Sequence, residues 1–116
     1  MRVVRIETDD GRVVCERCEV ADGFVTRGRG LLGRDHLAPG DGILLRPAGS
    51  VHTLFMRFPI DAVFCDKELR VVGVAADLAP WRFAGRLHAR ATIELAAGEA
   101  AHRGVVAGTR LRLVEP

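Results

Sequence analysis

Hydrophobic and polar residues alternate near the start of the chain in a way that predicts two strands. Residues 2–8 are rich in valine and isoleucine, and residues 12–20 alternate, although imperfectly. Asp10 and Gly11 lie between the two runs, and this dipeptide strongly favours a tight hairpin turn. Residues 1–20 are therefore predicted to form an N-terminal β-hairpin.

The next segment predicts the principal helix, at about residues 22–33. Asp22 is a suitable N-cap, and Gly33 is a suitable C-terminal stop. Apolar residues recur at helical spacing and should be buried, namely Phe24, Val25, Leu31 and Leu32. Gly28 and Gly30 each cost about 1 kcal/mol relative to alanine in a helix interior. This helix must therefore depend on packing against the rest of the domain.

The remaining chain predicts a run of short strands separated by turns. We expect strands at residues 42–46, 51–58, 60–66, 70–78, 91–96 and 109–114, a loop at 79–89, and a loop with one helical turn at 98–108. The 51–58 segment is apolar on both faces, which predicts a central strand. Pro59 ends that strand because proline cannot donate to a central ladder. Strands at roughly ten-residue spacing favour a single mainly β (α+β) domain with a barrel-like or sandwich-like sheet.

Composition and charge narrow the class of protein. The 116 residues are 48% hydrophobic and 28% charged, which is ordinary for one globular domain. The chain has 17 basic and 15 acidic residues, and division at residue 58 leaves each half with a net charge of +1. This even division argues against nucleic-acid or membrane-surface binding. Sixteen of the basic residues are arginines, which is typical of a GC-rich bacterial genome.

The N-terminus and the cysteines predict a cytoplasmic location. Arg2 and Arg5 interrupt the first residues, and no stretch approaches the roughly 18–20 apolar residues of a membrane span. Cys15, Cys18 and Cys65 are too few, and odd in number, for a disulfide scaffold. We therefore expect a cytoplasmic protein, and we expect it to be a monomer.

Four segments of the sequence resemble one known family. They are R-x-x-G-L-L-G-R at residues 27–34, G-I-L-L at 42–45, H-T-L-F-M-R-F-P-I-D-A-V-F at 52–64 and I-E-L-A-A-G at 93–98. Together they resemble the DUF192 family, also called UPF0127, and the 52–64 segment is the most specific part. The resemblance implies a compact, mainly β core at residues 21–114 with one short helix. Because the family is a domain of unknown function, the resemblance implies no particular chemistry.

Three local motifs match known signatures in their letters only. Residues 28–33 spell the dinucleotide fingerprint G-x-G-x-x-G, but the glycines lie within a predicted helix and not between a strand and a helix. Cys15 and Cys18 match half of a zinc site that Cys65 and one histidine could complete, but on a regular strand the two side chains point to opposite faces. Ser50 lacks the glycines of a nucleophile elbow. We therefore predict plain thiols, no metal and no cofactor.

Four polar residues in apolar surroundings form the candidate site, namely His52, Arg57, Asp61 and Glu94. Burial of an unpaired charge is costly, so each should have a partner or face a cleft. Pro59 could turn the chain so that Asp61 returns to Arg57, and a buried ion pair would then fix the turn. Alternatively, Arg57 binds an anion in a cleft where His52 titrates near neutral pH. A metal site made of His52, Asp61 and Glu94 is the third alternative.

Arg34 and Trp81 complete the set of candidate ligand-binding residues. Trp81 lies among arginines and could line a ligand mouth, stack on a base, or cover the open end of the sheet, which we favour. The small size of the chain favours binding over catalysis. We predict a binding module for a small polar or anionic ligand, or for a partner, near His52, Arg57 and Asp61. The alternative is a small hydrolase-type or metal-dependent enzyme that uses the same cluster. No nucleic-acid or membrane partner is expected.

Overall fold

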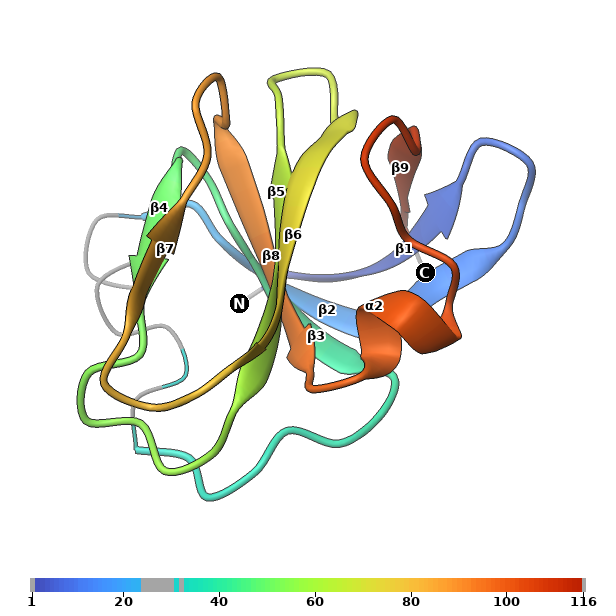
Figure 1. Cartoon of the computed structure of the whole chain (residues 1–116). Helices are drawn as coiled ribbons and strands as arrows, with labels where there is room; N and C mark the ends of the chain where they lie inside the picture. The colour runs from blue at the N-terminus through green and yellow to red at the C-terminus, as the bar shows by residue number, and fades with distance from the viewer. Residues whose placement is uncertain (1, 24–30, 32, 116) are drawn as a thin grey trace.

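A computed structural model describes residues 2–23, 31 and 33–115, and its strands form two sheets (Figure 1). The described elements are β1 (Val3–Thr8), β2 (Val13–Ala21), β3 (Asp41–Leu45), β4 (Ser50–His52), β5 (Ile60–Cys65), β6 (Val71–Leu78), β7 (Phe83–Gly85), β8 (Ala91–Ala96), α2 (Glu99–His102) and β9 (Leu111–Val114). Seven strands form the main sheet in the order β6-β5-β8-β3-β2-β1-β9. β4 and β7 form a separate antiparallel pair. The mainly β fold predicted from the sequence is confirmed.

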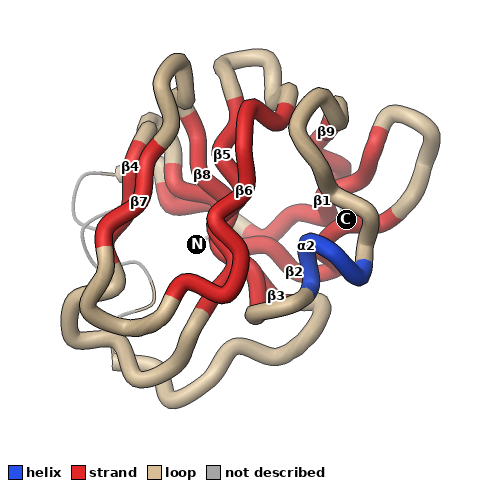
Figure 2. The backbone as a smooth tube through the Cα atoms, in the orientation of Figure 1, coloured by secondary structure: helices blue, strands red, loops and turns tan. Residues whose placement is uncertain are grey.

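The main sheet curls on itself without closing into a barrel (Figure 2). β2 and β3 are parallel, and the other neighbouring strands are antiparallel. The edge strands β6 and β9 approach each other at one end, where Arg70 and Arg110 form an isolated bridge. The backbone N–H of Leu111 also donates to the carbonyl of Leu69 there, at 3.0 Å. Within the described residues, no strand pairing joins the two edges beyond this point.

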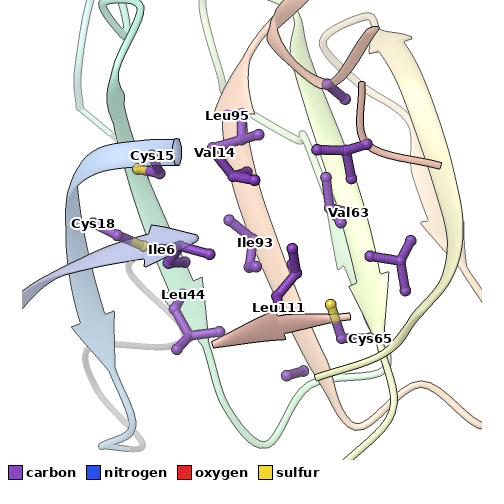
Figure 3. Close-up of a cluster of buried hydrophobic side chains, with 14 of the residues drawn as sticks. Ile6, Val14, Cys15, Cys18, Leu44, Val63, Cys65, Ile93, Leu95 and Leu111 are labelled. Carbon is purple, nitrogen blue, oxygen red and sulfur yellow. The ribbon is translucent and has the colours of Figure 1, made fainter. Parts of the chain in front are cut away.

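The concave side of the curled sheet holds the larger hydrophobic core (Figure 3). Ile6, Leu44, Val63, Ile93 and Leu111 pack together there, each from a different strand. β5 and β8 are buried along their whole length, and β3 is buried after its first residue. These three strands are covered on both faces, which explains why they appear in the sequence as nearly continuous apolar runs.

A second hydrophobic core covers the convex side of the same central strands. It joins Ile43, Ala62 and Phe64 of the main sheet to Leu31, Met56 and other apolar residues outside it. The small β4–β7 sheet contributes Val51, which belongs to this core, and Ala84, which packs against it. The small sheet is therefore held against the convex side of the main sheet by one apolar face.

A β-bulge places both N-terminal cysteines in the concave core. Val4 of β1 pairs with Cys18, whereas Ile6 pairs with Cys15, so three steps along β2 match two steps along β1. Both thiols are fully buried in that core. The prediction that their side chains point to opposite faces is therefore wrong, because the argument assumed a regular strand.

The predicted central strand at residues 51–58 is also wrong. Only Ser50–His52 is a strand, and it belongs to the small sheet. The chain then turns, and Phe55 adopts a left-handed backbone with φ 65°. β7 lies within the predicted loop at 79–89. The principal helix predicted at residues 22–33 lies largely outside the described residues, among them Phe24, Val25 and Leu32, although Leu31 is buried as expected.

Candidate functional site

Asp61 is a structural carboxylate on the concave side of the sheet. Its side chain is 0% exposed and accepts three hydrogen bonds from backbone N–H groups. The donors are Asp77 at 2.8 Å, Gly98 at 3.1 Å and Ala100 at 2.9 Å. Two of them lie at the start of the short helix α2, so Asp61 satisfies N–H groups that a helix leaves unpaired. The predicted ion pair between Asp61 and Arg57 is therefore absent.

Arg57 lies on the surface and pairs with another carboxylate. Its guanidinium Nη1 is 2.6 Å from Oδ1 of Asp35, and both side chains are mostly exposed. Exposed pairs of this kind contribute little to stability. Arg57 therefore does not fix the turn around Pro59 as the sequence suggested.

Glu94 is buried on the convex side, away from Asp61. It lies on β8 between Ile43 of β3 and Ala62 of β5, and it is 3% exposed. No hydrogen-bond donor to its carboxyl group is found among the described residues. Burial raises the pKa of this carboxyl group to about 7. Asp61 and Glu94 face opposite sides of the sheet, so they cannot form one site with His52. Among the described residues, no three His, Cys, Asp or Glu side chains are placed to hold a metal ion.

Arg34 borders an open cavity of about 410 Å³ at residues 33–38 and 41. Its guanidinium is 2.6 Å from a carboxylate oxygen of Glu19. Asp35 and Asp41, which also line the cavity, are held by Arg57 and Arg17. The charged groups around this cavity, His36 apart, are therefore already neutralised by neighbours.

The outer face of the small sheet carries exposed rings. His52 of β4 pairs directly with Phe83 of β7, and their ring centroids are 6.3 Å apart. Phe83 is 74% exposed, and His52 is exposed as well. On the opposite face Val51 and Ala84 contact the core, so alternation along two short strands accounts for this arrangement.

Two further exposed aromatic residues lie next to the small sheet in the sequence, Phe55 after β4 and Trp81 before β7. The rings of Phe55 and Trp81 lie 4.7 Å apart at 58°, and the side chains are 70% and 54% exposed. Both residues have a left-handed backbone, with φ 65° for Phe55 and 66° for Trp81. This conformation is strained for a bulky side chain and costs about 1–3 kcal/mol per residue. The fold therefore maintains two strained residues whose rings face solvent.

Thr53 holds the two strained loops together. It is fully buried, and its backbone N–H donates to the carbonyl of Arg82 at 2.8 Å. Its carbonyl accepts from the backbone N–H groups of Trp81 at 2.9 Å and Met56 at 3.1 Å. Its hydroxyl donates to the carbonyl of Ala79 at 2.6 Å and accepts from the N–H of Arg82 at 2.8 Å. Five hydrogen bonds at one residue thus fix the loops that present Phe55 and Trp81.

The segments that form this face contain no acidic residue. Residues 46–60 and 79–90 hold five arginines and two histidines, which leaves 12 of the 17 basic residues and all 15 acidic residues elsewhere. Only Arg57 among these five arginines has an ion pair within the described chain. We call this surface the basic aromatic face and define it by His52, Phe55, Arg57, Trp81, Arg82 and Phe83. Arg86 is not part of it, because its guanidinium lies over the ring of Phe64 at 5.2 Å and donates to the carbonyl of Val74 on β6 at 3.1 Å.

The basic aromatic face contains three of the six residues predicted from the sequence, namely His52, Arg57 and Trp81. Asp61, Glu94 and Arg34 lie elsewhere. Sequence reasoning missed Phe55 and Phe83, because the positive φ and the cross-strand pairing that expose them depend on tertiary contacts. The absence of acidic residues from the two segments was visible in the sequence, but division of the chain into halves concealed it.

Solved structures share this fold at low sequence identity. A protein of unknown function from Novosphingobium aromaticivorans DSM 12444 is 23% identical, with a TM-score of 0.81 over 95% of this chain and 83% of that one. A putative transcription regulator from Sinorhizobium meliloti 1021 is 24% identical, with a TM-score of 0.83 over 96% of this chain and 92% of that one. A putative exported protein from Burkholderia pseudomallei K96243 is 15% identical, with a TM-score of 0.54, and this chain covers 24% of it. At these identities the likeness concerns the fold alone.

The family assignment comes from the sequence match over nearly the whole chain. No curated protein matches this chain. Among the described residues, no helix has the length and apolar character needed to cross a membrane. The model of the family DUF192, described as Uncharacterized ACR, COG1430, matches residues 4–113 and so includes the N-terminal hairpin. The chain therefore belongs to the DUF192 family.

Proposed function

We propose that this domain is a binding module for an anionic partner, which docks on the basic aromatic face. One observation carries the proposal. The exposed rings of Trp81 and Phe83 flank Arg82 in the sequence, and Arg82 is exposed and has no carboxylate partner within the described chain. Guanidinium groups bind carboxylate or phosphate oxygens through paired N–H donors. The rings supply apolar contact area at low cost in side-chain entropy.

A purely structural role does not account for this face. The apolar side of the small sheet already covers the convex core through Val51, so the outward rings are not needed for that purpose. Phe83 and Phe55 are among the most exposed large apolar side chains in the described chain. Aromatic residues and arginine are enriched in the central parts of interfaces. The strain at Phe55 and Trp81 also supports a functional role, since strained residues cluster at ligand-binding sites.

The proposal narrows the function predicted from the sequence. His52 and Arg57 remain in the site, whereas Asp61 leaves it because its carboxylate is satisfied by three backbone N–H groups. The partner is anionic because the face adds positive charge without acidic residues to offset it, apart from Asp35 beside Arg57. Such a field steers and retains a polyanion.

Binding of polyanions at varied salt tests the proposal. Isothermal titration with inorganic polyphosphate and with a short single-stranded oligonucleotide should give an affinity that falls with salt. For a single strand the slope of log K against log salt is about −0.7 per phosphate contacted. Arg82→Glu should weaken binding and make the slope shallower, whereas Arg110→Glu, at an exposed arginine near β9 without an ion pair in the described chain, should change binding little. Equal effects of the two variants, or no binding of any polyanion, would contradict the proposal.

We also propose a cytoplasmic location. The chain has three free cysteines, Cys15, Cys18 and Cys65, and all are buried as thiols. Reduced thiols persist in the cytosol, whereas oxidising compartments favour disulfides. Fractionation of cells that express the protein with a C-terminal epitope tests this location, and recovery outside the cytoplasm would contradict it.

A further inference from the structure

We infer that the anionic partner is a single-stranded nucleic acid, whose bases stack on the rings of the basic aromatic face while its phosphates contact the arginines. This inference rests on the proposed function and names the chemical class of its partner. The supporting observation is the combination of four exposed rings with two segments, residues 46–60 and 79–90, that hold five arginines and no acidic residue.

The rings form two neighbouring pairs that can accept flat ligands. His52 and Phe83 lie opposite each other across the small sheet, and Trp81 is two residues before Phe83. Trp81 in turn contacts Phe55. The hydrogen bonds of Thr53 to residues near both loops hold the pairs in place before any ligand arrives. Preorganised aromatic platforms of this kind are how proteins bind unpaired bases, at about 1–3 kcal/mol per stacked base.

The alternative polyanions use less of this surface. Inorganic polyphosphate or a peptide of glutamates alone can pair with Arg82, but neither offers a flat apolar group for Phe83 and Phe55. In a duplex the bases are stacked inside, so exposed rings on a protein surface cannot reach their faces. A single strand offers both the phosphates and the free base faces. Stacking is tolerant of sequence, so we expect little preference among bases.

The sequence analysis argued against nucleic-acid binding because the charge is divided evenly along the chain, and the structure shows why that division is not decisive. The halves of the chain carry equal charge, but the two acid-free segments are separated by 18 residues in the sequence and are joined in space by the pairing of β4 with β7. The pairing of β4 with β7 therefore brings together the two segments that contain arginines and no acidic residue. Absence of nucleic-acid binding remains a prediction from the sequence, and the following experiment decides between it and the present inference.

Trp81 provides a direct probe because it is the only tryptophan and the chain has no tyrosine. The wild-type protein is titrated with oligothymidylate of about a dozen nucleotides, within the usual range of site sizes. Polyphosphate, polyglutamate and a duplex of matched charge are the comparison ligands. Stacking of a base on Trp81 should quench its fluorescence with oligothymidylate only. Isothermal titration should give a tighter affinity for oligothymidylate than for each comparison ligand.

Variants separate the rings from the charges. Phe83→Ala removes one outward ring and should weaken oligothymidylate binding by about 5- to 100-fold, with polyphosphate binding unchanged. Val106→Ala, at another exposed apolar residue outside the face, is the matched control and should have no effect. Circular dichroism establishes that each variant is folded, and the ligand comparison with wild-type protein needs no variant.

The outcomes distinguish the inference from the proposed function. Quenching by oligothymidylate alone, together with a selective loss in Phe83→Ala, supports both. Binding of every polyanion with equal affinity and without quenching would overturn the inference and leave the proposed function intact. Binding of none of the polyanions would overturn both.

Discussion

The carboxyl group of Glu94 provides a sharp test of the convex core. Glu94 is 3% exposed on the central strand β8, and its neighbours across the sheet are Ile43 and Ala62. Burial removes most of the water around this carboxyl group. The ionised form is therefore destabilised relative to the protonated form. We expect Glu94→Gln, which keeps the shape and removes the ionisation, to change stability in a pH-dependent way.

The direction and size of this effect follow from the pKa. Burial raises the pKa of Glu94 from its ordinary value of 4.5 to about 7. The folded protein thus binds this proton more tightly than the unfolded chain does. The corresponding stabilisation is fully present below about pH 4.5 and is lost as the pH rises through 7. At 1.36 kcal/mol per pKa unit, the charged carboxylate costs about 3 kcal/mol above pH 8.

Urea unfolding of wild type and Glu94→Gln at about pH 4 and above pH 8 measures this difference. The two proteins should be similar in stability at the lower pH, and the variant should be more stable by about 3 kcal/mol at the higher pH. Other titrating groups are common to both proteins and cancel. Glu68→Gln, at an exposed position, should show no such change between the two pH values. A difference for Glu94→Gln that is the same at both pH values would refute the reasoning.

Three further predictions follow from the described contacts. Asp61→Ala should lower the free energy of unfolding by about 3–5 kcal/mol in chemical denaturation, because three backbone donors lose their acceptor, and an unchanged midpoint would contradict this. Thr53→Val should lower the free energy of unfolding by about 1–3 kcal/mol and weaken polyanion binding in the same titrations, because the hydrogen bonds of the hydroxyl group to Ala79 and Arg82 are lost. No change in stability and no change in binding would contradict the role of Thr53 in fixing the loops. Purified protein should carry no stoichiometric zinc by elemental analysis, since among the described residues no third His, Cys, Asp or Glu is placed to complete a site with Cys15 and Cys18; one zinc per chain that is lost in Cys15→Ser and Cys18→Ser would overturn this.

The sequence predicted elements whose pattern reflects local burial. The strands near residues 60–66 and 91–96 appear as β5 and β8, because continuous apolar runs bounded by turn residues suit strands covered on both sides. The segment at 51–58 has the same apolar character, but the strand there ends at His52. The residues after His52 form a turn, because the hydrogen bonds of Thr53 to the 79–82 loop outweigh the local preference for a strand. Such contacts between residues far apart in the sequence cannot be derived from periodicity.

The candidate site was predictable only in part for the same reason. Asp61 and Arg57 were paired because they are opposite charges four residues apart. The structure instead satisfies Asp61 with backbone N–H groups from α2 and β6, which no pattern of charges indicates. His52 and Trp81 were identified as unusual residues for their positions. Their assembly into one face with Phe83 depends on the β4–β7 pairing, which joins segments that the sequence analysis treated separately.

Mapping of backbone amide chemical shifts during titration with oligothymidylate tests most directly whether the basic aromatic face is the binding site. We predict salt-dependent shifts concentrated at residues 50–57 and 81–86, together with quenching of Trp81. The surface around Arg110 should remain unchanged. Shifts concentrated there, or no shifts at low salt, would contradict the assignment of the site to the basic aromatic face.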